Sequence, residues 1–211
     1  MIHDFHYVSK KEYRPVREQL WRLINEVQKD MKKNDFSFQF KPIGSSSRNM
    51  ITRDKKANVG FDFDINIYPN VDFDEYTPKE LRSKITNSFN KFLKKYGYSP
   101  CEDSTRVITI KVIDTENSKI LHSCDMAIVL YDDEGTPWYV HCNKQGNKKH
   151  YELQLLPDPY ELDERIEWLK ENDLWDDVKE MYITLKNNNT NRDRKSRSMF
   201  AEAVNNVYNA N

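Results

Sequence analysis

The stretch VGFDFDINIYP, residues 59–69, constrains the fold more than any other part of the chain. Its apolar residues alternate with polar ones, which is the period of a half-buried β-strand. The apolar set is Phe61, Phe63, Ile65 and Ile67. Asp62 and Asp64 therefore fall on one face, roughly 6.5–7 Å apart along the strand. Two carboxylates this close repel each other unless one is protonated or a cation lies between them.

A third acid occupies a similar position in the run KILHSCDMAIVLYDD, residues 119–133. Asp125 alternates there with apolar neighbours and is the lone acid of the part LHSCDMAIVLY, residues 121–131, which is expected to be buried. If the two strands are neighbours, the three aspartates converge and can hold two metal ions about 3.5–4 Å apart. Oxygen-only ligands suit Mg²⁺, with Mn²⁺ as an alternative. The competing interpretation is a set of solvated acids at a strand edge or end.

The segment Gly44–Ser47, with the sequence GSSS, follows a predicted strand and precedes Asp62. We expect its backbone N–H groups and hydroxyls, with Gly44 and Ser45 foremost, to open a helical turn that can bind a phosphate tail. The chain lacks the GxxxxGK[ST] pattern of a P-loop, which excludes P-loop chemistry. Taken alone, the same letters also describe an ordinary loop.

Periodicity and capping signals predict the remaining elements. Helices are expected at residues 13–33, 77–97, 159–172, 174–188 and 196–208. Strands are expected at residues 36–42, 106–113, 119–133 and 136–145, besides 59–69. Thr77 and Glu80 form a capping-box pattern, and Gly97 follows as a stop signal. The order predicts a mixed α+β fold with a catalytic core at residues 1–150 and a small helical lobe at residues 151–211. The N-terminal helix is free to pack on that lobe.

Composition and charge narrow the class of protein. The chain has 211 residues, a net charge of −1 and 37% hydrophobic residues, which favours a globular core over a nucleic-acid coat. Its three cysteines, Cys101, Cys124 and Cys142, lack CxxC spacing, as is usual for a reduced protein. No apolar run of signal-peptide or membrane-spanning length is present, so the sequence predicts a cytoplasmic protein without a membrane partner.

The sequence from the GSSSRN turn through FDFDINI to SCDMAIV resembles the nucleotidyltransferase superfamily of the DNA polymerase β type. The resemblance covers roughly residues 36–131. It implies a mixed sheet with flanking helices, and a Gly-Ser turn, Gly44 and Ser45, that binds the triphosphate of an NTP. It also implies that Asp62, Asp64 and Asp125 are the catalytic metal ligands.

Beyond residue 131, the C-terminal segment looks like the helical part of cyclic-oligonucleotide synthases and their oligoadenylate-synthase relatives. In those enzymes a lysine that ends a central helix and a serine that opens a later helix reach the triphosphate. The matching residues are Lys186 and Ser198, with Ser196 as an alternative. The resemblance also implies ATP binding and a role in antiviral defence. This chain departs from the family in its small helical lobe and in lacking a zinc-ribbon insertion.

Several alternatives stay open from the sequence. The acceptor of the nucleotidyl group can be a nucleotide, an RNA, a protein or an antibiotic, and a non-catalytic nucleotide- or RNA-binding module is the rival class. The basic loop Arg192–Arg197 fits a solvated loop, a phosphate contact or an RNA contact. The histidine and cysteine spacings fit no standard zinc finger. Tyr131 shares the face of Asp125 and is a candidate for base stacking.

Overall fold

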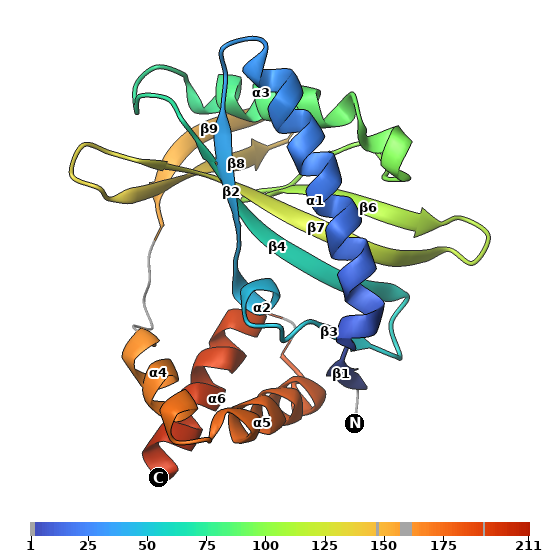
Figure 1. The fold of residues 1–211 in the computed structure, drawn as a ribbon, viewed down its shortest axis with the longest axis vertical. Helices are drawn as coiled ribbons and strands as arrows, with labels where there is room; N and C mark the ends of the chain where they lie inside the picture. The colour runs from blue at the N-terminus through green and yellow to red at the C-terminus, as the bar shows by residue number, and fades with distance from the viewer. Residues whose placement is uncertain (1–2, 147, 157–161, 192) are drawn as a thin grey trace. The chain divides into compact units, whose positions relative to one another are not determined.

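The computed structural model describes residues 3–146, 148–156, 162–191 and 193–211. It divides into two compact units, each described by itself. The sheet unit comprises Val8–Ile51 and Val59–Leu156, and the helical unit comprises the described residues of Met1–Tyr7, Thr52–Asn58 and Pro157–Asn211. The elements mix helices with a large sheet, so the predicted α+β class is confirmed (Figure 1).

The sheet unit is built around seven strands. They are β2 (Phe38–Pro42), β4 (Val59–Pro69), β5 (Glu102–Asp103), β6 (Ile108–Asp114), β7 (Lys119–Tyr131), β8 (Pro137–Gln145) and β9 (Lys148–Leu155). Five strands run in the order β2-β4-β7-β6-β5, and β8 pairs with β7 and β9. β4 and β7 are parallel, whereas the other pairs are antiparallel. This parallel pair lies at the centre of the sheet.

Helices α1 (Lys10–Lys32) and α3 (Pro78–Asn90) cover one face of this sheet, as Figure 1 shows for α1. Both helices share one hydrophobic core with β2, β4, β6 and β7. The four alternating apolar residues of β4 are at most 4% exposed and belong to that core. The opposite face of β4 and β7 therefore carries Asp62, Asp64 and Asp125, whereas His122 lies on the core side against Phe61.

Helix boundaries follow local capping. In α3, Thr77 accepts the Glu80 N–H and the Glu80 side chain accepts the Thr77 N–H, so the predicted capping box is confirmed. The expected single helix to Gly97 is instead α3 followed by the 3-10 helix η1 (Leu93–Tyr96). α1 begins earlier than expected because Ser9 caps it, and Pro15 lies inside the helix.

The helical unit contains α4 (Asp163–Glu171), α5 (Trp175–Asn188) and α6 (Ser196–Ala210). It also contains the two-stranded sheet of β1 (Phe5–Tyr7) and β3 (Thr52–Asp54), which the sequence pattern did not predict. The start of the expected helix at residues 159–172 lies partly outside the described residues. The predicted boundary between residues 150 and 151 falls within β9, and the division into a core and a lobe stays a prediction.

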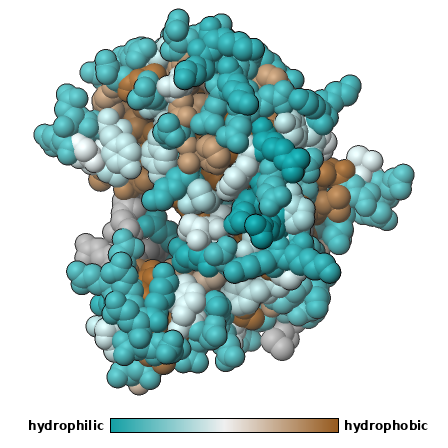
Figure 2. Space-filling view, viewed as in Figure 1, coloured by the Kyte–Doolittle hydropathy of each residue, from teal (hydrophilic) through white to brown (hydrophobic). Residues whose placement is uncertain are grey.

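Among the helices in the described part of the chain, none combines the length and the apolar character needed to cross a membrane. Hydrophilic residues cover most of the face drawn in Figure 2, with hydrophobic residues in smaller groups.

Candidate active site

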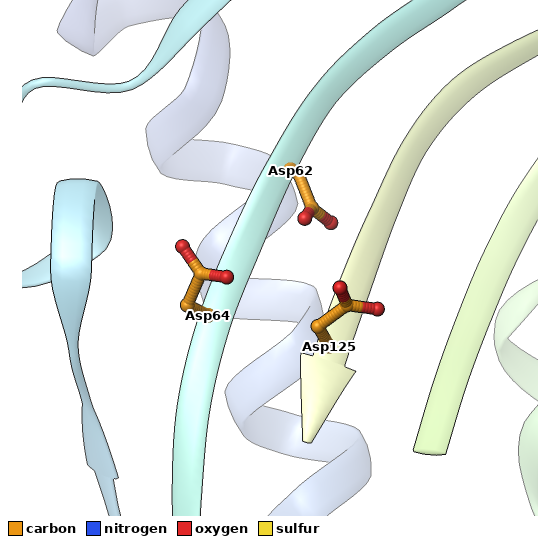
Figure 3. A group of neighbouring side chains, drawn as sticks. All are labelled: Asp62, Asp64 and Asp125. Carbon is orange, nitrogen blue, oxygen red and sulfur yellow. The ribbon is translucent and has the colours of Figure 1, made fainter. Parts of the chain in front are cut away.

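The central strands bring the three predicted acids together. In the parallel β4–β7 pair, Asp64 is opposite Asp125 and Asp62 is opposite Ser123. Each aspartate follows a core-facing residue, so its side chain leaves the sheet on the face opposite α1. One carboxylate oxygen from each of the three residues lies within 4.8 Å of the others. Figure 3 shows the carboxyl groups projecting from two neighbouring strands into a common space.

The electrostatics of this cluster are unfavourable without a cation. Burial raises the pKa of Asp62 to about 8, with further contributions from the charges of Asp125 and Asp64. The Oδ1 atom of Asp62 is buried and has no hydrogen-bond partner among the described residues. Burial also raises the pKa of Asp125. A bound divalent cation would stabilise the ionised form of these carboxyl groups.

Two hydroxyls orient the acids, and the sequence pattern did not identify either of them. Thr109, opposite Asp125 on β6, donates a hydrogen bond of 2.5 Å from its Oγ1 to the Asp125 Oδ1. Ser123 on β7 hydrogen-bonds the Asp62 carboxyl, which opposes the rise in its pKa. The side chains of both residues lie on the same face of the sheet as the three aspartates. Their role could therefore be predicted only once the pairing of the strands was known.

The Gly-Ser turn is attached directly to Asp64. The short helix α2 (Gly44–Ser47) begins at Gly44, whose φ is +58°. A Cβ at Gly44 would lie 3.1 Å from the Asp64 Oδ2, so a side chain there would crowd the carboxylate as well as strain the backbone. Ser46 Oγ accepts the Asp64 N–H at 3.0 Å, and the Ile43 N–H donates to the Asp64 carbonyl at 2.9 Å. These bonds fix the turn relative to the acids.

Ser45, the serine predicted to bind phosphate, is half-buried in this turn. The Ser46 side chain is buried and satisfies a backbone N–H, so it is committed to the structure of the turn. The expectation of a helical turn after the strand is confirmed, although the turn starts at Gly44 itself.

Lys186 and Ser198 belong to the helical unit. Lys186, which the resemblance places at the triphosphate, is only 7% exposed. Its Nζ donates to Thr52 Oγ1 at 2.7 Å and lies 4.1 Å from the centroid of the Phe5 ring. Ser198 is half-buried in the first turn of α6. A role for either residue in nucleotide binding stays a prediction.

The structure also describes the candidate zinc ligands and part of the basic loop. Across the described residues, the three aspartates are the only group of at least three His, Cys, Asp or Glu side chains placed to share an ion, so no zinc cluster is found there. In the basic loop, Arg194 forms an ion pair with Glu202, and Lys195 and Arg197 are exposed. Arg192 lies outside the described residues.

No protein-family model matches the chain. No curated protein matches it either. Solved structures of Vibrio cholerae DncV are similar. The GTP-bound form has a TM-score of 0.57 at 15% identity, over 95% of this chain and 52% of DncV. DncV cyclic AMP-GMP synthase with nonhydrolyzable GTP has a TM-score of 0.58 at 14% identity, over 95% and 53%.

A third DncV structure, in complex with the linear intermediate 5′ pppA(3′,5′)pG, has a TM-score of 0.55 at 15% identity. It matches 95% of this chain and 54% of its own. The chain thus spans about half the length of the solved structures it matches. At these identities the likeness concerns the fold, and it agrees with the sequence resemblance. The protein has the nucleotidyltransferase fold of the cyclic dinucleotide synthase DncV.

Proposed function

We propose that the protein is a Mg²⁺-dependent nucleotidyltransferase, which transfers an NMP group from an NTP to a hydroxyl acceptor. The observation that carries this proposal is the convergence of Asp62, Asp64 and Asp125 on the face of the sheet opposite α1. The fixed turn at Gly44, bonded to Asp64 on both sides, supports it.

The residues fit a divalent cation. All three offer carboxylate oxygens, the ligands that Mg²⁺ and Mn²⁺ prefer. The Asp62 Oδ1, which is buried without a hydrogen-bond partner among the described residues, and the raised Asp62 pKa support this fit, because a cation would stabilise the ionised carboxylate. When bound, two cations would neutralise phosphate charge and lower the pKa of the acceptor hydroxyl. In this proposal Asp62, Asp64 and Asp125 would hold the cations.

The transfer needs little covalent chemistry from the protein. The acceptor oxygen forms a bond to the α-phosphorus, and the bond from that phosphorus to the β-bridging oxygen breaks, releasing pyrophosphate. In this proposal Asp125, which accepts a hydrogen bond from Thr109, takes the proton of the acceptor hydroxyl. The remaining contribution is positioning and charge neutralisation.

The β- and γ-phosphates of the NTP are assigned to the turn Gly44–Ser47. Ser45 and the N–H groups beside Gly44 would bind the β- and γ-phosphates, as such turns do. By resemblance, Lys186 and Ser198 would add contacts to the same tail. The similarity to DncV bound to GTP and to the linear intermediate 5′ pppA(3′,5′)pG supports a nucleotide acceptor and a cyclic or linear oligonucleotide product.

The test is product formation from α-³²P-labelled NTPs with Mg²⁺ or Mn²⁺, separated by chromatography. We expect labelled oligonucleotide from the wild type and none from Asp64→Asn, with activity retained by Asp133→Asn, which changes an exposed acid outside the cluster. Transfer of the label to an added protein or antibiotic would identify that molecule as the acceptor. Tight NTP binding without turnover in every condition would refute catalysis and leave a binding module.

A further inference from the structure

Three uncharged side chains of the helical unit contact the ammonium of Lys186. The Lys186 Nζ lies 4.1 Å from the centroid of the Phe5 ring and 5.3 Å from that of the Tyr182 ring. It also donates to Thr52 Oγ1 at 2.7 Å. Because an aromatic face attracts a cation, and does so more strongly away from water, these groups fix where the ammonium lies. We term Phe5, Thr52 and Tyr182 the lysine seat.

The lysine seat is assembled from three segments of the chain. Tyr182 precedes Lys186 by four residues on α5, so the helix itself brings its ring to the lysine. Thr52 comes from β3 and Phe5 from β1, and these two strands pair. The side chain of Phe5 therefore reaches the ammonium only when β1 is in place.

Strand β1 is bonded to α5, against which it lies (Figure 1). Asn187, the residue after Lys186, accepts the Phe5 N–H on its Oδ1 at 2.6 Å, and its Nδ2 donates to the Phe5 carbonyl at 3.1 Å. The Tyr7 hydroxyl donates to the Lys179 carbonyl at 3.0 Å. A sheet of two three-residue strands is marginal by itself, so these bonds to the helix stabilise it.

A second anchor of the same segment lies on β3. Asp54 is buried, accepts the Asp4 N–H at 2.9 Å and lies 2.7 Å from His3 Nδ1. The residues before Phe5 are thus tied to β3, whereas Phe5 itself is tied to α5. Together the two anchors hold the Phe5 ring against Lys186.

Ordering of this lysine has a consequence for anion binding. A mobile lysine loses rotamer freedom when it orders on a ligand, and this loss weakens binding. In the lysine seat much of that freedom is lost before a ligand arrives. The seat residues are neutral, so their contacts leave the positive charge of the ammonium unchanged. An ammonium held in this way is suited to a phosphate group.

We infer that β1 positions Lys186 for the triphosphate of the NTP, with Phe5 acting as a positioning residue through Lys186. The inference rests on the proposed function, which assigns a triphosphate contact to Lys186. It extends that assignment to a strand that the sequence pattern did not predict. An NMP lacks the β- and γ-phosphates, so the lysine seat should affect the binding of NTP and leave the binding of NMP unchanged.

Calorimetric titration with a nonhydrolysable NTP and with NMP, both in Mg²⁺, tests the lysine seat. Phe5→Leu keeps an apolar side chain but removes the aromatic face, and it should weaken NTP binding about fivefold. Phe5→Tyr, which keeps the face, should stay within about twofold of the wild type, as should NMP binding in every variant. The matched control is His6→Leu, which replaces the neighbouring ring on the other face of β1 and should leave NTP binding unchanged.

Two further variants separate positioning from folding. Thr52→Val removes the seat hydroxyl with little change in volume and should weaken NTP binding about threefold, so the test does not depend on the folding of Phe5→Leu. Adding Phe5→Leu to Lys186→Ala should weaken NTP binding by no more than about twofold further, because Phe5 acts through the lysine. Full losses from both changes in the double variant would show that Phe5 acts on the fold, and would overturn the inference.

The remaining outcomes separate this inference from the proposed function. Unchanged or tighter NTP binding in Phe5→Leu and Thr52→Val, equal weakening of NTP and NMP binding, or no NTP binding by the wild type would overturn the inference. Transfer of the labelled nucleotide with an NTP affinity insensitive to the seat would overturn the inference and keep the proposed function. Seat-dependent NTP binding without any transfer would keep the inference and refute the proposed function.

Discussion

Asp62→Asn should stabilise the metal-free protein at alkaline pH. Burial and two neighbouring carboxylates raise the Asp62 pKa to about 8 from the ordinary value of 3.8. Between about pH 4 and pH 8 the folded protein therefore keeps a proton on Asp62 that the unfolded chain has released. The free energy of unfolding falls as the pH rises over this interval. The asparagine carries no charge and removes this dependence.

The size of the effect follows from the same pKa. Each unit of difference between folded and unfolded pKa corresponds to about 1.4 kcal/mol. Half of the difference, taken to allow for relaxation around the cluster, gives about 3 kcal/mol above pH 8. Below pH 4 the aspartic acid is protonated in both states, so the two proteins should differ little.

Urea unfolding in EDTA at pH 5, 7 and 8.5 measures the difference. We expect the advantage of Asp62→Asn to grow with pH, with Asp133→Asn as the control that shows no such trend. Added Mg²⁺ should stabilise the wild type by about 2.7 kcal/mol at a hundred times its Kd and the variant by much less. A variant that is less stable than wild type by the same amount at every pH would refute the account of the cluster.

Three further changes test the surrounding groups. Thr109→Val should lower kcat about tenfold and move the acidic limb of the kcat–pH profile to higher pH. The reason is that the Thr109 hydrogen bond lowers the Asp125 pKa. An unchanged profile would contradict this role. Ser46→Ala should raise the KM for NTP more than it lowers kcat, because it loosens the turn from Asp64; steady-state kinetics measures the split, and equal loss in both parameters would count against it. Lys186→Ala should weaken NTP binding about tenfold and NMP binding far less. A lower melting temperature with unchanged NTP and NMP affinities, by calorimetry, would make this lysine structural, as its contacts with Thr52 and Phe5 already allow.

The candidate acids could be predicted because a strand has a period of two. Once Phe61 and Phe63 are assigned to the core, Asp62 and Asp64 have to face away from it. The capping box at Thr77 is equally local and was equally readable. The sequence did not predict that β4 pairs with β7. The convergence of Asp125 with Asp64 could therefore be predicted only on the assumption that the two strands are neighbours.

Contacts between distant segments were not readable. β9 was missed because KKHYELQL carries a weak alternation and many charges. The resemblance places Lys186 at the triphosphate, yet its ammonium packs against Phe5 and Thr52, which come from segments far away in the sequence. Thr109 was missed for a similar reason, since its role depends on which residue of β7 lies opposite it.

The central claim is that Asp62, Asp64 and Asp125 hold the cations on which transfer depends. Anomalous diffraction from crystals grown with Mn²⁺ and a nonhydrolysable NTP tests it most directly. The account predicts two peaks about 3.5–4 Å apart, each bound by oxygens of these aspartates and of the triphosphate. Nucleotide density with no anomalous peak at the three carboxylates, or with peaks held by other residues, would contradict it.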